Sequence, residues 1–145
     1  MNDANPNPRA TGGCLCGSVG FRVDGPLRPV VNCHCVQCRK TSGNFVAATA
    51  ALRDDLTMTE QSGLRWYRSS EQARRGFCGT CGASVFWEPD QGERIAIMAG
   101  ALDSPTGLYS VAHIYVASAG DYYDLNDDLV KIEGGDFGDS LPLDC

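Results

Sequence analysis

The segment Phe77-Cys78-Gly79-Thr80-Cys81-Gly82 decides the fold of this chain. Its two cysteines stand three positions apart, and the two glycines beside them let the backbone wrap tightly enough for both sulfurs to face one ion. A closed structural metal site takes four ligands in a tetrahedron, so this knuckle needs two more ligands from elsewhere in the chain. The sequence therefore predicts a domain that is folded around metal ions.

All but one of the other cysteines also lie close to one another. Five of them form the pair Cys14-Leu15-Cys16 and the triple Cys33-His34-Cys35-Val36-Gln37-Cys38. The exception is Cys145, the last residue. We find no apolar leader in the first residues, and cysteines with these spacings then favour thiolate metal ligands over disulfides. The pattern predicts a cytoplasmic protein, and it assigns no role to Cys145.

Seven clustered cysteines divide into four and three. Alternate residues of a strand face the same side, so the pair Cys14 and Cys16 fits the knuckle as the other half of a closed structural site. The triple would then hold a second ion with one coordination position open, as reactive zinc sites do. The spacing alone leaves the opposite arrangement open, in which the triple joins the knuckle.

Within the triple, Cys33 and Cys35 should share one face of a strand, and Cys38 should return from a turn or short helix that begins near Val36. His34 lies between two of these cysteines and should point away from the metal, because neighbouring strand residues face opposite sides. Two other interpretations stay open. The triple could be a structural site completed by His34 or a distant residue, or Cys35 and Cys38 could form a redox pair.

Length and composition limit the class of protein. The chain has 145 residues and 15.5 kDa, with 43% hydrophobic and 21% charged residues, which is the composition of a single globular domain. Its net charge of −6 and the lack of a basic tail disfavour nucleic acid as a partner, and no segment suits a membrane. Seventeen glycines and seven prolines favour short strands joined by turns.

Hydrophobic patterning predicts a mainly β domain with one weak helix at Tyr123–Ile132 and a loop or single helical turn at Cys38–Gly43. We expect an extended or disordered segment at residues 1–11, the zinc-binding domain at 12–134 and an acidic tail at 135–145. The expected strands are Ser18–Val23, Arg28–Cys35, Phe45–Ala51, Leu64–Arg68, Arg74–Phe77, Ser84–Trp87, Arg94–Ala99 and His113–Ala117.

The cysteine groups and their flanks, in this order, resemble the glutathione-dependent formaldehyde-activating enzyme family, which includes centromere protein V. The segments that carry the resemblance are Gly13–Val19, Cys33–Arg39, Ser42-Gly43 and Phe77–Gly82, and later Gly100–Asp103, His113–Val116 and Asp127–Leu129. The resemblance implies a single-domain β-tent fold of small antiparallel sheets organised around zinc. It places a structural zinc on Cys14, Cys16, Cys78 and Cys81, and a catalytic zinc on Cys33, Cys35 and Cys38.

The same resemblance implies a carbon–sulfur lyase of the S-(hydroxymethyl)glutathione synthase type. Glutathione would be the cosubstrate, and a small electrophile such as formaldehyde its partner in the reaction. Arg39 and Lys40 follow the triple directly and are candidates for binding glutathione carboxylates. The chain departs from the family at 119–123, Ala-Gly-Asp-Tyr-Tyr, where the family often has a tryptophan, so a substrate contact of that tryptophan is in question here.

Two functions of other classes compete with this one. The chain could be a non-catalytic, zinc-stabilised binding module, or a thiol redox switch that uses the cluster Cys33, Cys35 and Cys38. His113, in an apolar stretch, fits a hydrogen-bonded core histidine. Metal content and glutathione binding separate the three functions, and the sequence indicates no oligomeric state.

Overall fold

The computed structural model describes residues 8–135 of the chain. Most of the two expected terminal segments, and Cys145 with them, lies outside the described residues. The described part is mainly β, as expected. Its strands are β1 Ala10–Gly13, β2 Gly20–Val23, β3 Val30–Cys33, β4 Val46–Leu52, β5 Leu56–Glu60, β6 Leu64–Arg68, β7 Ala73–Cys78, β8 Ser84–Pro89, β9 Arg94–Met98, β10 Ser110–Ile114 and β11 Val130–Lys131, and its α-helix is α1 Val36–Ser42.

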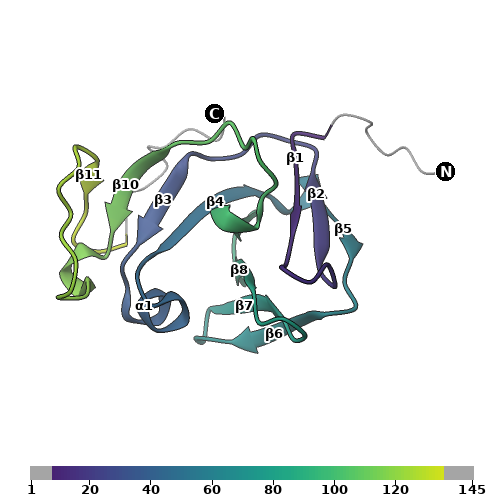
Figure 1. Ribbon diagram of the computed structural model, residues 1–145, viewed down its shortest axis with the longest axis horizontal. Helices are drawn as coiled ribbons and strands as arrows, with labels where there is room; N and C mark the ends of the chain where they lie inside the picture. Colours follow the sequence, from purple (N-terminus) through teal and green to yellow (C-terminus); the bar gives the residue numbers. More distant parts are fainter. Residues whose placement is uncertain (1–7, 136–145) are drawn as a thin grey trace.

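The strands form two sheets (Figure 1). One has the order β1-β2-β5, and the other has the order β11-β10-β3-β4-β9-β8-β7-β6. Nearly all pairs are antiparallel, as expected, but β10 runs parallel to both β3 and β11. The parallel pair brings His113 beside Asn32 and Ile114 beside Cys33, so the end of β10 lies next to the triple.

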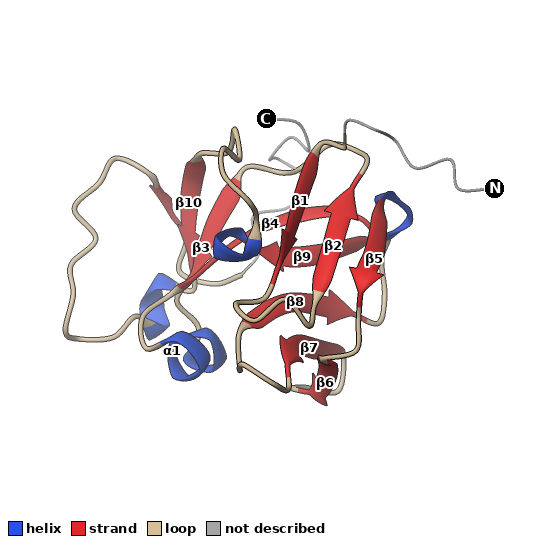
Figure 2. Cartoon of the chain, turned by 45° about the vertical axis from the view of Figure 1, so that its right-hand side comes forward, coloured by secondary structure: helices blue, strands red, loops and turns tan. Residues whose placement is uncertain are grey.

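The main core lies between the two sheets, whose strands cross in Figure 2. Period-2 alternation places Phe21 and Val23 of β2 on the inner face, and Phe86 of β8 packs on the Phe21 ring with centroids 5.2 Å apart. Cys78 is part of this core and has no exposed surface. The knuckle is therefore joined to the largest apolar cluster of the described residues.

Most of the expected strands are present, with ends that shift by one or two residues. Leu64–Arg68 has the expected bounds, whereas the expected Arg28–Cys35 is shorter, at Val30–Cys33. Three strands, β1, β5 and β11, were not predicted. In β5 the half-buried Leu56 and Met58 alternate with exposed residues, which is a readable signal, but β1 reads Ala-Thr-Gly-Gly and carries no apolar alternation.

The expected helix at Tyr123–Ile132 is wrong. Residues 121–129 form turns and irregular structure. They are followed by β11, and directly after β11 the Ile132 N–H donates to the His113 carbonyl at 2.9 Å. The side chains of Tyr123 and Asp127 are hydrogen-bonded to histidines of other elements. Tertiary contacts therefore override a weak helical propensity.

The expected strand at His113–Ala117 also needs correction, because β10 ends at Ile114. Tyr115 is left-handed, with φ of 54° and ψ of 40°, and this conformation turns the chain out of the sheet into a 3₁₀ turn at Val116–Ser118. The left-handed backbone turns the Tyr115 side chain to the pocket described below.

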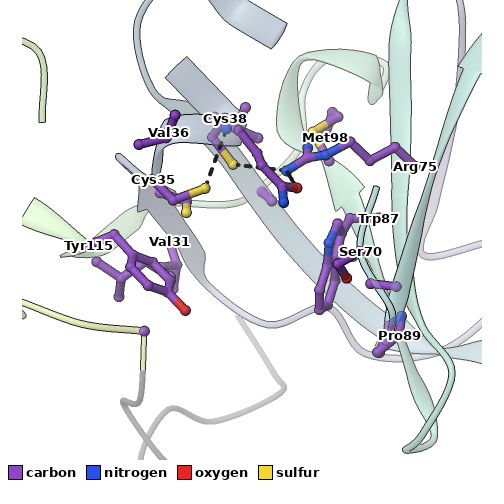
Figure 3. Close-up of a pocket in the computed structure, with 18 of the residues that line it drawn as sticks. Val31, Cys35, Val36, Cys38, Ser70, Arg75, Trp87, Pro89, Met98 and Tyr115 are labelled. Atoms are coloured by element: carbon purple, nitrogen blue, oxygen red, sulfur yellow. Dashed lines mark hydrogen bonds between the residues drawn. The ribbon is translucent and has the colours of Figure 1, made fainter. Parts of the chain in front are cut away.

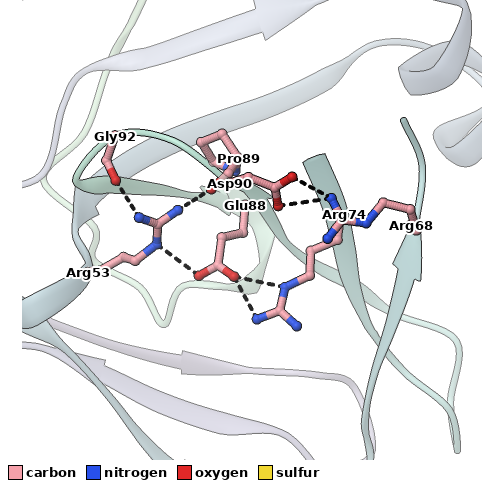
Figure 4. Close-up of polar contacts among 7 residues, drawn as sticks. All are labelled: Arg53, Arg68, Arg74, Glu88, Pro89, Asp90 and Gly92. Carbon is pink, nitrogen blue, oxygen red and sulfur yellow. Dashed lines mark hydrogen bonds and ion pairs between the residues drawn. The ribbon is translucent and has the colours of Figure 1, made fainter. Parts of the chain in front are cut away.

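A cluster of ion pairs joins neighbouring strands (Figure 4). Glu88 of β8 accepts from Arg53 Nε at 3.0 Å and from Arg74 Nε of β7 at 2.8 Å. Arg68 of β6 contacts Asp90, just beyond β8, at 2.8 Å. These contacts connect β6, β7, β8 and the turn after β4, and so brace the strands that form one wall of the pocket. In the described part of the chain, no helix is long and apolar enough to cross a membrane.

Candidate metal centres and pocket

The structure brings the cysteines together as four and three, and not in the opposite arrangement. The sulfurs of Cys14, Cys16, Cys78 and Cys81 all lie within 4.8 Å of one another, and those of Cys33, Cys35 and Cys38 do the same. All seven are free thiols. We call the first set the four-cysteine group and the second the three-cysteine group.

Backbone donors point at the sulfurs of the four-cysteine group. Val19 N–H donates to Cys14 Sγ at 3.2 Å, and the N–H groups of Thr80 and Cys81 donate to Cys78 Sγ at 3.4 and 3.5 Å. The hydrogen bond from Ala83 N–H is the largest influence that lowers the pKa of Cys81, to about 6. Amide donors stabilise thiolates, and four clustered thiolates are the donor set of a closed metal site, so these residues fit a metal ion.

The three-cysteine group is built at the junction of β3 and α1. Cys33 ends β3, Cys35 caps the N-terminus of α1, and Cys38 lies in the first turn of that helix. Cys35 has extended backbone angles, and its sulfur accepts the N–H of Cys38 at 3.3 Å. The cap turns the chain sharply, so residues that are three positions apart present their sulfurs to one point, as the sequence predicted for a short helix beginning near Val36.

The surroundings of Cys38 favour its thiolate form. A hydrogen bond from the Cys33 thiol, followed by the contact with Arg75, lowers the pKa of Cys38 to about 5. The same bond raises the pKa of Cys33 above its ordinary value. Arg75 of β7 places Nη2 3.5 Å from Cys38 Sγ and 3.3 Å from Gln37 Oε1. A thiolate with close sulfur neighbours and a facing cation fits a metal ion.

A cavity of about 710 Å³ lies against the three-cysteine group. Figure 3 shows Tyr115 and Trp87 on opposite sides of it, with Cys35, Cys38 and Arg75 between them at one end. Most of the lining is apolar, and Arg28 and Arg75 contribute positive charge. The other lining residues include Val31, Val36, Val46, Met98 and Ile114 on the apolar side and Ser70, Gln72 and Ser118 on the polar side.

This cavity has the size and character of a small-molecule site, with an apolar wall and a few convergent polar groups. Its reactive end is the three-cysteine group, because no other cysteine lines it among the described residues. A ligand that enters the cavity therefore meets sulfur atoms and a guanidinium at one end.

Comparison with known proteins identifies the family. A model of the glutathione-dependent formaldehyde-activating enzyme family matches residues 9–118. The chain belongs to this family. The matched residues include both cysteine groups and Arg75, and they end before the loop that carries Tyr123 and Asp127.

Two other proteins are similar to this chain. An uncharacterised lyase of Schizosaccharomyces pombe is 29% identical over 87 residues, which is 59% of this chain. The alignment spans 62% of that lyase, less than two thirds of its length. The crystal structure of a Rhodobacter sphaeroides protein is also similar, with a TM-score of 0.55 and 26% identity, over 65% of this chain and 88% of that one.

Arg39 and Lys40, the candidates for glutathione carboxylates, lie on α1, where Arg39 is half-buried and Lys40 is exposed. Neither lines the cavity. Arg75 was not predicted as a site residue. One signal was available, because the neighbours Arg74 and Arg75 lie on a predicted strand and must face opposite sides of it. Arg74 turns to Glu88, and Arg75 turns to the three-cysteine group.

His34 is fully buried and does not line the cavity, so its ring points away from the side on which the three cysteines line the cavity. Its Nε2 lies 2.8 Å from His113 Nδ1, and His113 Nε2 lies 2.8 Å from Asp127 Oδ2. Burial, followed by the nearby His113, lowers the pKa of His34. The His113 bond lowers the pKa of Asp127 to about 2. Both histidines are thus hydrogen-bonded within the fold.

Proposed function

We propose that this protein is a zinc-dependent carbon–sulfur lyase that joins the thiol of glutathione to a small electrophile such as formaldehyde, and that it cleaves the same adduct in reverse. The observation that carries the proposal is the three-cysteine group at the end of a cavity that two arginines line. Membership in the family and a relative named a lyase support an enzyme of this class. Seven free cysteines fit a reducing compartment such as the cytoplasm.

Each residue set has a separate task in this proposal. The four-cysteine group would hold a structural zinc, and Cys33, Cys35 and Cys38 a second one. Three thiolates around Zn²⁺ leave a position that suits a soft sulfur ligand, and a bound thiol loses its proton. Arg75 offsets negative charge beside Cys38, where a further thiolate would otherwise be repelled.

The reaction forms one carbon–sulfur bond. The glutathione sulfur donates an electron pair to the carbonyl carbon, the C=O π pair moves to oxygen, and that oxygen takes up a proton, which gives S-hydroxymethylglutathione when the electrophile is formaldehyde. The cavity holds both reactants together, and this proximity contributes much of the rate. We assign the negative carboxylates of glutathione to the cationic part of the lining, at Arg28 and Arg75.

Binding of glutathione should release a proton and depend on pH. The free thiol has a pKa of about 8.5, so glutathione arrives protonated at neutral pH and binds as thiolate. Apparent affinity should therefore rise about tenfold per pH unit below that pKa. Calorimetry of the zinc-loaded protein between pH 6 and 8 measures this dependence, and an aldehyde screen for adduct formation then identifies the electrophile.

S-methylglutathione is the matched control, because it keeps every carboxylate but has no proton to lose. It should bind far more weakly and with an affinity that does not change over this pH range. Equal affinities for the two compounds, with no proton release, would exclude binding through sulfur and favour the binding-module function. One zinc per chain together with oxidisable thiols would favour the redox switch.

A further inference from the structure

Two neighbouring tyrosines contact both ends of the segment that carries the three-cysteine group. The hydroxyl of Tyr123 lies 2.6 Å from His34 Nδ1, between Cys33 and Cys35 in sequence. The hydroxyl of Tyr122 donates to the Gly43 carbonyl at 2.9 Å, directly after α1. A loop from another part of the chain therefore contacts the segment His34–Gly43 at both of its ends.

The hydrogen bonds through Tyr123 form a chain with one consistent direction. Ionised Asp127 only accepts, so His113 Nε2 donates to it, and we assign the tautomer in which His113 Nδ1 accepts from His34 Nε2. His34 Nδ1 in turn accepts from the Tyr123 hydroxyl, whose oxygen accepts Gly120 N–H at 3.3 Å. Both ring nitrogens of His34 and both ring nitrogens of His113 therefore have a hydrogen-bond partner, and these bonds set the orientation of the His34 ring.

Fixing His34 also fixes the cysteines beside it. The His34 N–H donates to the Ile114 carbonyl at 2.9 Å, so both its backbone and its side chain are held by β10 and the loop. The Phe45 ring packs against the imidazole, with centroids 4.8 Å apart. The His34 ring is held on the side away from the cavity, whereas Cys33, at the end of β3, and Cys35, at the cap of α1, line the cavity.

We propose that residues 120–127 form a positioning clamp, which holds Cys33, Cys35 and Cys38 in the geometry that binds a metal ion at the cavity. The clamp lies beyond residues 9–118, which the family model matches. Tyr122, Tyr123 and Asp127 are positioning residues, because none of them lines the cavity. This inference rests on the proposed function in one respect, that the three-cysteine group holds a metal.

The test is the rate of zinc release from a Tyr123→Phe variant. The substitution removes one hydroxyl, which donates to His34 and accepts from Gly120, and leaves the ring in place. Losing a direct hydrogen-bond partner of a metal ligand typically costs about ten- to a hundredfold in metal affinity, and Tyr123 acts one residue further out, through His34, so we take the lower end of that range. We expect one of the two zinc ions to transfer to a chromogenic chelator about tenfold faster than in the parent protein, while the other transfers at the parent rate.

Tyr109→Phe is the matched control, since Tyr109 is 56% exposed, lies outside residues 120–127 and does not line the cavity, and it should leave both rates unchanged. Unchanged release from Tyr123→Phe, with two zinc ions per parent chain, would overturn the clamp and leave the proposed function standing. Faster release of both ions would also overturn it, because the effect would then be general destabilisation. A parent protein that binds one zinc would contradict the proposed function itself.

Discussion

Replacing Cys78 with serine should leave the chain unfolded or aggregated. Its sulfur belongs to the four-cysteine group, 3.7 Å from Cys16 Sγ, and its side chain is fully buried in the main core. Structural zinc contributes about 10–16 kcal/mol in zinc-finger peptides, which is comparable to the whole free energy of unfolding of a domain, about 5–15 kcal/mol. Circular dichroism, size-exclusion chromatography and metal analysis would measure the outcome, and Cys14→Ser should behave in the same way.

Cys145→Ser is the control for this variant, because it makes the same chemical change at the one cysteine outside the two clustered groups of the sequence. It should fold and bind metal as the parent protein does. A soluble Cys78→Ser protein with parental melting temperature and two metal ions would contradict the assignment of the knuckle to a structural site.

Replacing Cys38 with serine should abolish thiol-dependent activity and leave the fold largely intact. Cys38 packs in a small satellite cluster with Val46 and Met98, separate from the main core between the sheets. Mutating a residue that only contacts a metal ligand lowers activity by up to ~100-fold, so replacing a ligating cysteine itself should lower activity at least as much. The measurement compares turnover with glutathione, metal content, and the melting temperature, which we expect to fall by only a few degrees.

Cys35→Ser makes the corresponding change at the cap of α1 and should give the same separation of activity from folding. If both variants instead unfold completely, the three-cysteine group is a structural site. That result would favour the zinc-stabilised binding module over the lyase.

The parts of the site whose residues are close in sequence were predictable from the sequence. The knuckle, the pair and the triple are visible in spacing, and the short helix after Cys35 follows from the need to return Cys38 to the other sulfurs. The strands with clear alternation, such as Leu64–Arg68, were also predictable. Local patterns report local geometry, and these features are local.

The rest depends on contacts between residues that are distant in sequence. Arg75 reaches Cys38 across 37 positions, and Tyr123 reaches His34 across 89. The loop with Tyr123 and Asp127 read as a weak helix because its residues carry no strong breaker, while its conformation is set by bonds to His34 and His113. Propensity is a weak prior where side chains find tertiary partners.

The most direct test of the central claim, that the three-cysteine group takes a thiol as its fourth ligand, is the absorption spectrum of the cobalt-substituted protein during a titration with glutathione. A new sulfur ligand should strengthen the thiolate-to-metal charge-transfer band, because a thiolate-rich ion with an open position prefers a soft ligand to water. S-methylglutathione should leave the band nearly unchanged. An identical spectrum before and after saturation with glutathione would contradict the claim, although the chain belongs to the family.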